Sequence, residues 1–267
     1  MKTENTVVSG YAPLNGFKMY YEVRGEGGVP LVLIHGGGST IESTFGRVID
    51  SFAKTRKVIA MELQSHGHTE DIDRPLSFEQ DADDVAALLQ YLKIDNADFF
   101  GFSNGGTTTL QIAIRHPKLV RKAVVASAIY RRDGTFPQFW DFMKQAKQSP
   151  MPVELQEAYK KAAPDTANLK QLHYKCVDRV LGFEDIPDEA IKTIQAPTMV
   201  VISDADVATP EHAAALYRLL PHGSIAIFPG GHGEYIGEVC TLSSGANTYM
   251  GTVKIIETFL DKPLPAK

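Results

Sequence analysis

The sequence predicts an α/β fold with a mostly parallel central sheet, helices on both faces of that sheet, and a helical insertion. Short apolar runs of strand type alternate with helical segments along the chain, and this order is typical of parallel sheets. Residues 130–189 interrupt the alternation, because they contain no strand-like run and are divided by prolines and glycines. With 267 residues, of which 43% are hydrophobic, the chain is long enough to bury a sizeable core.

The predicted strands are short runs rich in apolar and β-branched residues. Residues 11–14 and 17–23 flank a turn at Gly16 and predict an N-terminal hairpin. The other runs are apolar almost throughout, which indicates strands buried on both faces of a sheet. They span residues 30–34, 57–61, 97–102, 122–127, 198–202 and 224–228.

The predicted helices are marked by capping residues and by apolar spacing. Ser77 and Gln80 form a capping box, so a helix should begin at residue 78, and apolar residues then recur at spacings of three and four up to Leu92. Further helices are expected over residues 104–115, 211–220 and 250–260. We therefore expect residues 1–129 and 190–267 to form one core, with residues 130–189 as a cap inserted into it.

Composition excludes several classes of function. The 27 basic and 32 acidic residues give a formal charge of −5, and no dense basic run is present, so we expect no nucleic-acid partner. No stretch of about 18 apolar residues predicts a membrane span. The two cysteines, Cys176 and Cys240, are expected to be free thiols, and no secretory signal is visible, which favours a cytoplasmic location. A mature chain whose signal had been removed would look the same.

The segment Gly101-Phe-Ser103-Asn-Gly105 lies between a predicted strand and a predicted helix. In that context the pattern G-x-S-x-G predicts a tight turn that exposes the serine hydroxyl above the sheet. Glycines on both sides remove side chains that would clash where strand and helix approach each other. Ser103 is therefore the candidate nucleophile.

Two backbone N–H groups are candidates for binding a developing negative charge. The N–H of Asn104 lies at the beginning of the predicted helix, where N–H groups lack partners and the helix dipole is positive. The segment from His35 to Gly38 follows another buried strand and has three glycines. Gly37 is the preferred second donor there, and its neighbour Gly38 remains an alternative. We expect His35 itself to hold this loop through hydrogen bonds.

A serine nucleophile needs a base and an acid that orients the base. His232 follows the last predicted strand, at the same edge of the sheet as Ser103, and is the candidate base. Asp204 and Asp206 both follow the preceding strand, and either could be the acid. His212, beside a predicted surface helix, is expected to be solvated.

These segments together resemble serine hydrolases of the α/β-hydrolase fold superfamily, in its helical-cap, esterase-like branch. The resemblance covers nearly the whole chain and implies a catalytic triad of Ser103, Asp206 and His232. In that family the acid usually follows a strand-ending glycine by three positions, which favours Asp206, although Ser203 replaces that glycine here. The residues that carry the resemblance are 35–38, 64–69, 101–106, Asp206 and 229–232.

No metal or cofactor is expected. His66 and His68 could suggest a metal site, but no third ligand is evident, and we expect them to form hydrogen bonds within their own loop. The predicted cap carries an aromatic cluster that could line an apolar substrate pocket. The pocket candidates are Gly38, Phe136, Phe139 and Trp140.

The resemblance implies a cofactor-independent hydrolase that cleaves a carboxylic ester or lactone of a small apolar molecule through an acyl-enzyme. Two other chemistries could use the same triad, namely carbon–carbon bond hydrolysis and cofactor-free perhydrolysis. A serine at the nucleophile position argues against epoxide hydrolase and haloalkane dehalogenase, whose members use an aspartate there. The alternative of another class is a small-ligand receptor that uses the hydrolase fold without turnover.

Overall fold

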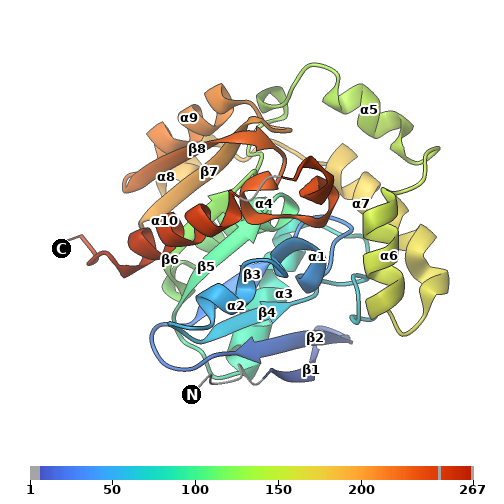
Figure 1. Cartoon of the computed structure of the whole chain (residues 1–267), viewed down its shortest axis with the longest axis horizontal. Helices are drawn as coiled ribbons and strands as arrows, with labels where there is room; N and C mark the ends of the chain where they lie inside the picture. The colour runs from blue at the N-terminus through green and yellow to red at the C-terminus, as the bar shows by residue number, and fades with distance from the viewer. Residues whose placement is uncertain (1–6, 246–247, 266–267) are drawn as a thin grey trace.

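An eight-stranded sheet runs through the centre of the computed structural model, which describes residues 7–245 and 248–265 (Figure 1). The strand order is β1-β2-β4-β3-β5-β6-β7-β8. The strands are β1 (Val8–Leu14), β2 (Phe17–Arg24), β3 (Leu31–Ile34), β4 (Val58–Met61), β5 (Ala97–Phe102), β6 (Val120–Ala126), β7 (Thr198–Ala205) and β8 (Gly223–Gly231).

The sheet is parallel except at the edge formed by the N-terminal hairpin. β1 pairs with β2, and β2 with β4, in antiparallel register, whereas every pair from β4 to β8 is parallel. Asn15 and Gly16 form the tight turn of the hairpin with positive φ angles of 48° and 90°. The predicted hairpin and the mostly parallel sheet are both confirmed.

Alternate residues of the central strands face two separate hydrophobic cores. In β3, Val32 and Ile34 pack with helices on one face, whereas Leu31 and Leu33 pack with helices on the other. All four side chains are buried, which explains why this strand reads as a continuous apolar run. Parallel strands of this kind require helices on both faces, and the structure has them.

The helices fall into two layers around the sheet. One layer contains α3 (Phe78–Tyr91), α4 (Asn104–Arg115) and α9 (Pro210–Leu219), and the other contains α1 (Ile41–Phe45), α2 (Ile49–Phe52) and α10 (Tyr249–Asp261). The four helices predicted from the sequence are present within a few residues of their expected bounds. The short helices α1 and α2 were not predicted, because each is too short to show a period.

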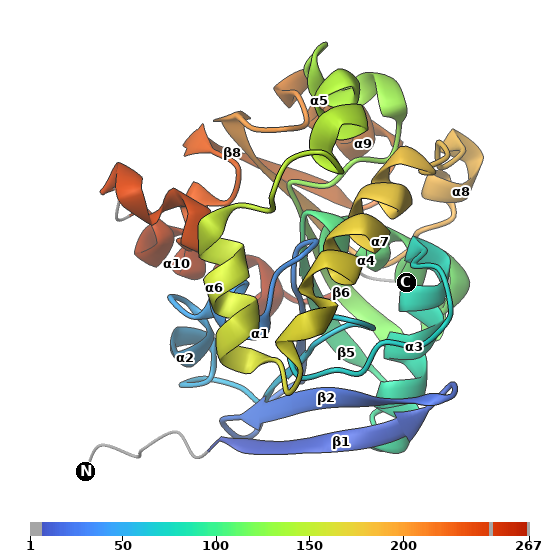
Figure 2. The same cartoon turned by 90° about the vertical axis from the view of Figure 1, so that its right-hand side faces the viewer.

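The chain between β6 and β7 is helical and contains no strand. It forms α5 (Phe139–Ala146), α6 (Val153–Ala162), α7 (Leu169–Leu181) and α8 (Asp188–Lys192). Figures 1 and 2 show α5, α6 and α7 together at the end of the sheet where β3 and β5 finish. In contrast, α8 packs against α4 and α9, so it belongs to the helix layer of the sheet. None of the described helices is long and apolar enough to cross a membrane.

Candidate active site

Ser103 lies on a sharp turn between β5 and α4. Its φ and ψ of 55° and −120° are unusual for a residue with a side chain. The flanking glycines make the turn possible, because a Cβ on Gly101 would lie 2.0 Å from the Gly105 carbonyl oxygen. A Cβ on Gly105 would lie 2.1 Å from the Ile34 carbonyl oxygen, which belongs to the neighbouring strand. The local sequence therefore forces the serine outward from the end of the sheet.

The ends of β5, β7 and β8 bring three predicted site residues together. The His232 Nε2 atom is 3.1 Å from Ser103 Oγ, and its Nδ1 atom is 2.5 Å from Asp206 Oδ1. Asp204 lies elsewhere: it is exposed, and its carboxylate accepts a hydrogen bond from the Gly230 N–H at 2.9 Å. Of the two aspartates left open by the sequence, only Asp206 reaches the imidazole.

Asp206 and His232 each stabilise the charged form of the other. Burial raises the pKa of the Asp206 carboxyl, but the nearby His232 and the hydrogen bonds to the carboxylate outweigh this and hold the pKa below its ordinary value. Burial lowers the pKa of the His232 imidazole, and the Asp206 carboxylate raises it by more, so the net pKa lies above the ordinary value. The arrangement keeps an ionised carboxylate beside a ring that accepts protons readily.

The loop after β3 presents one N–H group without a partner beside Ser103. The Gly38 N–H donates to His66 Nε2 at 3.1 Å, whereas the Gly37 N–H has no hydrogen-bond partner among the described residues. A Cβ on Gly37 would lie 2.2 Å from Asn104 Nδ2, so a larger residue there would displace the Asn104 side chain. Asn104 begins α4, and its own N–H has no partner within the helix. Gly37 and Asn104 thus keep the two N–H groups that the sequence singled out.

Two buried histidines hold this loop in place. His35 Nδ1 donates to the Gly36 carbonyl oxygen at 2.7 Å, and its Nε2 accepts from the Leu63 N–H at 3.0 Å. His66 bonds the Gln64 carbonyl oxygen through Nδ1 at 2.8 Å and accepts from Gly38 through Nε2. Burial lowers the pKa of His35 to about 4 and that of His66 well below its ordinary value, so both rings are neutral. The predicted structural role of His35 is confirmed.

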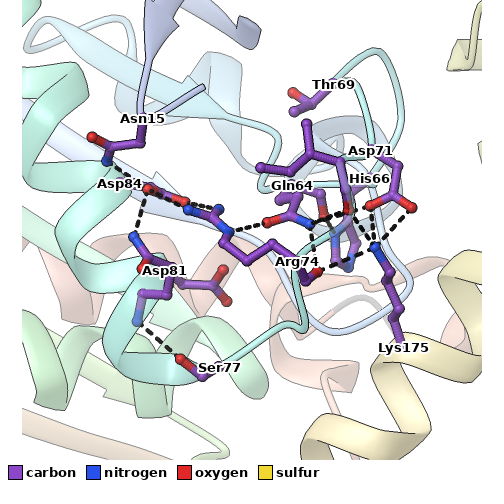
Figure 3. A network of polar contacts seen from close by, with 12 residues as sticks. Asn15, Gln64, His66, Thr69, Asp71, Arg74, Ser77, Asp81, Asp84 and Lys175 are labelled. Carbon is purple, nitrogen blue, oxygen red and sulfur yellow. Dashed lines mark hydrogen bonds and ion pairs between the residues drawn. The ribbon is translucent and has the colours of Figure 1, made fainter. Parts of the chain in front are cut away.

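A polar network ties the His66 loop to the rest of the molecule (Figure 3). Arg74 bonds the Gln64 side chain at 2.7 Å and the Asp84 carboxylate of α3 at 2.5 Å. Gln64 in turn donates to Asp71 at 3.2 Å, and Lys175 of α7 bonds both Asp71 oxygens at 2.6 and 2.8 Å. The loop that supports Gly38 is therefore anchored to a core helix and to a helix of the inserted segment.

The ring nitrogens of His66 and His68 take part in hydrogen bonds. His68 is bonded to Glu62 through its backbone N–H at 2.6 Å and its ring Nδ1 at 2.9 Å. Within residues 7–245 and 248–265, no group of three His, Cys, Asp or Glu side chains is placed to hold a metal ion. Of these ring contacts only that of His66 with Gln64 lies within the loop 64–69, because His66 also bonds Gly38 and His68 bonds Glu62.

A cavity of about 260 Å³ opens over Ser103 and His232. Of the four pocket candidates, Gly38 and Phe139 line it, and Phe136 and Trp140 do not. Trp140 instead donates from its indole N–H to the Arg132 carbonyl oxygen at 2.8 Å, and the Arg132 guanidinium lies 3.7 Å from the ring centre. Phe136 packs edge to face on Phe139. These rings hold α5 to its neighbours rather than facing the cavity.

Sequence reasoning missed most of the lining. These residues come from α4, α5, α6, α7, the loop between α5 and α6, and the segments that follow the strands. They carry no motif, and the apolar character that most of them share is the one signal that could have suggested them. None of the side chains that the structure places around this cavity is Asp, Glu, Lys or Arg. The missed residues include Thr107, Ser127, Ile129, Phe142, Met143, Met151, Leu155, His173, Cys176, Val177, Val180 and Val207.

His212 is also corrected by the structure. It is 5% exposed, not solvated, because its Nε2 accepts from the Tyr130 N–H at 3.1 Å and its ring stacks on that of Tyr130. Burial lowers its pKa to about 4. His212 does not line the cavity, and its contacts with Tyr130 give it a structural role.

Comparison with known proteins gives consistent results. A family model described as the alpha/beta hydrolase fold matches residues 29–152. The human "Serine hydrolase BPHL" is 25% identical over 240 residues, which is 85% of this chain and 80% of that protein. The 2-hydroxymuconate semialdehyde hydrolase of Pseudomonas sp. strain CF600 is 37% identical over 101 residues, covering 37% of this chain and 36% of that protein.

The fold also matches solved structures over almost the full length. The crystal structure of a serine hydrolase involved in carbazole degradation, the CarC enzyme, aligns with a TM-score of 0.77 and 22% identity, covering 96% of this chain and 99% of that one. This likeness concerns the fold. The sheet order and the match to the family model agree with this likeness, so the chain has the alpha/beta hydrolase fold, and the curated relatives support a hydrolase of that fold.

Proposed function

We propose that this chain is a serine hydrolase that cleaves a carboxylic ester or lactone of a small, uncharged, apolar molecule. The single observation that carries the proposal is the continuous path of hydrogen bonds from Asp206 through His232 to Ser103, at the base of an apolar cavity. Such a path activates a hydroxyl for attack on an acyl carbon.

The first half of the reaction forms an acyl-enzyme. Ser103 Oγ attacks the acyl carbon while His232 Nε2 takes its proton, and Asp206 holds the ring by its Nδ1–H and stabilises the imidazolium. The negative charge that develops on the acyl oxygen is stabilised by the N–H groups of Gly37 and Asn104. His232 then gives its proton to the leaving alcohol, and the acyl group remains on the serine.

The second half releases the acid. His232 takes a proton from a water molecule, the resulting hydroxide attacks the acyl carbon, and the same two N–H groups stabilise the second tetrahedral intermediate. Collapse of the intermediate returns the proton to Ser103 and frees the carboxylic acid. No cofactor takes part in these steps.

The substrate class follows from the lining of the cavity. A substrate that carries a carboxylate would lose its hydration on entering, and this costs several kcal/mol or more unless a cation or a set of donors replaces the water. No Lys or Arg is among the residues that the structure places around the cavity. The lining itself therefore favours a neutral ester or lactone. The buried Arg179 lies next to this lining, because its Nη2 is 3.5 Å from a Cβ built on Gly37 and has no hydrogen-bond partner among the described residues.

We propose further that residues 130–189 act as the cap of this enzyme. Phe139, Met151 and Val177 come from this segment and line the cavity, while Ser103 and His232 come from the sheet side. The cap would then set specificity and the sheet would supply the chemistry.

Within the described residues, Cys176 and Cys240 form no disulfide, which fits the expected cytoplasmic location.

The proposal is tested by measuring turnover of matched ester substrates. Purified protein is assayed with p-nitrophenyl butyrate and with p-nitrophenyl hemisuccinate, which differs from it by a terminal carboxylate. We expect the neutral ester to be hydrolysed with a kcat/KM at least about tenfold higher, which corresponds to about 1.4 kcal/mol. Ser103→Ala should abolish both the turnover and covalent labelling by a fluorophosphonate, with the melting temperature preserved.

Other functions would give different results in the same assay. A preference for the hemisuccinate would contradict the substrate class. Cleavage of vinylogous diketones with no cleavage of esters would assign carbon–carbon bond hydrolysis instead, and peroxide-dependent turnover would assign perhydrolysis. Ligand binding without release of acid, and without labelling of Ser103, would assign a receptor.

A further inference from the structure

Two further hydroxyl groups continue the hydrogen-bond path behind Asp206. Ser127 follows β6, and its Oγ is 2.6 Å from Asp206 Oδ2, the oxygen that does not face His232. Tyr235 follows His232 in the short 3₁₀ helix Glu234–Ile236, and its hydroxyl is 2.7 Å from Ser127 Oγ. The path therefore runs from Tyr235 to Ser127 to Asp206, and from there to the imidazole.

The direction of each hydrogen bond in this path follows from counting protons. An ionised carboxylate can only accept, so Ser127 must donate its single hydroxyl proton to Asp206. Ser127 then has only lone pairs left for its other neighbour. Tyr235 must therefore donate to Ser127. Burial raises the pKa of Tyr235 well above its ordinary value, which keeps this donor protonated at every working pH.

Both hydroxyl groups are held rigidly. Tyr235 is 0% exposed, its ring stacks on Phe228 at an interplanar angle of 17°, and its edge meets Phe102 at 72°. Ser127 has a φ of 50°, in the left-handed region that residues with a side chain rarely occupy. Backbone strain of this kind persists where the surrounding structure holds a side chain in a required position. Here that position is the one that aims Oγ at the carboxylate.

The Asp206 carboxylate has a donor for each oxygen. Oδ1 faces the imidazole and also accepts from the Val207 N–H at 2.7 Å. Oδ2 accepts from the Ser203 N–H at 3.2 Å and from Ser127, and the second bond is much the shorter. Without the hydroxyl of Ser127, the one side-chain donor to Oδ2 is lost. The carboxylate could then rotate and would hold more of its charge unshared.

We propose that Ser127 and Tyr235 are positioning residues, which form a donor chain that fixes the Asp206 carboxylate and limits the charge it presents to His232. This inference rests on the proposed function, in which Asp206 orients the catalytic base. Neither residue exchanges a proton with the substrate. Tyr235 acts only through Ser127, since it does not line the cavity.

The donor chain of Tyr235 and Ser127 should affect how enzyme activity depends on pH. His232 must be neutral to act as a base, so activity is lost as pH falls through the pKa of His232. Removing a donor from Asp206 leaves more negative charge beside the ring, which favours the imidazolium and moves this loss of activity to higher pH. Among the described residues, the carboxylate of Glu238 also raises the pKa of His232, and neither hydroxyl contacts this carboxylate.

The test compares Tyr235→Phe with Tyr130→Phe. Both remove a hydroxyl from a buried tyrosine, but Tyr130 stacks on His212 away from the cavity. We expect Tyr235→Phe to lower kcat roughly threefold with KM unchanged, and to raise the pKa of His232 by a few tenths of a unit. Tyr130→Phe should change neither. The pKa is read in two ways, from the acid limb of kcat/KM and from NMR titration of the ring protons of His232.

A double variant tests whether Tyr235 acts through Ser127. Ser127→Ala should lower kcat roughly tenfold and raise the pKa of His232 by about half a unit. Because alanine is strained at the φ of Ser127, Ser127→Gly replaces it should the alanine variant not fold. The double variant should be no worse than the Ser127 variant alone, since the donor chain is already broken there.

Three results would overturn the inference. The first is a Tyr235→Phe enzyme with the wild-type kcat and the wild-type titration of His232. The second is a fully multiplicative double variant, because independent effects would mean that Tyr235 does not act through Ser127. The third is a fall in the pKa of His232 in the Ser127 variant. The NMR titration needs no substrate, so a protein that hydrolyses no ester would count against the proposed function and leave the test of the donor chain intact.

Discussion

The carboxylate of Asp206 and the imidazole of His232 meet at 2.5 Å, although 26 positions separate the two residues in the chain. Strands β7 and β8 are neighbours in parallel register, so the loops that follow them open at the same edge of the sheet. Asp206 follows β7 directly, and His232 follows β8 directly. The short distance is thus a consequence of sheet topology. It also distinguishes Asp206, which contacts the imidazole, from the nearby Asp204, which does not.

Asp206→Asn is expected to lower kcat by about 10²-fold or more, and Asp204→Asn by less than about threefold. Asparagine at position 206 keeps the shape of the side chain but loses the charge that stabilises the imidazolium and fixes the tautomer. Within the described part of the chain, Asp204 bonds only the Gly230 N–H. Steady-state kinetics on both variants decides the matter, and the reverse ranking would transfer the role of the acid to Asp204.

The fold and the triad could be predicted because their signals are local. A mostly apolar run such as residues 97–102, in which Asp98 is the one charged residue, is typical of a buried strand or a short piece of buried helix, and Gly101 within the run disfavours the helix. The order of nucleophile, acid and base along the chain then follows the order of the strands. The choice between Asp204 and Asp206 as the acid depended on a resemblance to a known family. The sequence pattern could not decide it, because the bend after β7 determines which carboxylate turns toward the imidazole.

The lining of the cavity and the donor chain could not be predicted, because they depend on packing. Trp140 and Phe142 are two positions apart on α5, yet Trp140 packs under Arg132 while Phe142 lines the cavity. Ser127 and Tyr235 are 108 positions apart and share no motif. Only the left-handed backbone of Ser127 marks it as unusual, and backbone angles are not visible in a sequence.

Phe142 and Trp140, two of the aromatic residues of α5, should respond differently to truncation. Phe142 is 64% exposed and lines the cavity, so Phe142→Ala should raise KM several-fold for long acyl chains with the melting temperature unchanged. Trp140→Ala removes a packed ring and its hydrogen bond to Arg132, and should lower the free energy of unfolding by about 2–4 kcal/mol with substrate ranking unchanged. Thermal unfolding and kinetics are measured on the same preparations. A change of substrate ranking in Trp140→Ala without loss of stability would return Trp140 to the pocket.

The free energy of unfolding should fall as pH drops below about 6.5. Burial lowers the pKa of His35 and of His212 to about 4 in the folded chain, whereas both titrate near 6.5 when unfolded. Between these values the unfolded state binds more protons, so stability is complete above about 6.5 and is lost as pH falls toward 4. Each ring contributes up to about 1.4 kcal/mol per pH unit within that window.

His212→Gln isolates one of these contributions. The glutamine amide oxygen can still accept from the Tyr130 N–H, but the side chain does not titrate. Urea unfolding is measured at pH 7.5, 6.5, 5.5 and 5.0. The free energy of unfolding should fall less steeply with decreasing pH in the variant, because the variant takes up roughly one proton fewer on unfolding. A loss of stability that is equally steep in both proteins would assign the acid sensitivity to other groups.

The ion pair between Lys175 and Asp71 should couple the inserted segment to the catalytic loop. Both side chains are largely buried, and of the contacts made by described residues Asp71 keeps only that with the Gln64 amide when the lysine is removed (Figure 3). Lys175→Met should therefore lower the free energy of unfolding by about 1–3 kcal/mol. Because the same loop carries the His66 ring that holds Gly38, we also expect a severalfold loss in kcat/KM. Lys170→Met, on an exposed lysine of the same helix, is the matched control and should change neither quantity.

A double-mutant cycle with Asp71→Asn separates coupling from simple loss of charge. If the two side chains stabilise each other, the double variant loses less stability than the sum of the single variants, by about 0.5 kcal/mol or more. The cycle is measured by urea unfolding at low and at high salt, and the coupling should persist in high salt because the pair is shielded from solvent. Strict additivity at both salt concentrations would show that Lys175 and Asp71 act independently, and that α7 is held to the core by its apolar contacts alone.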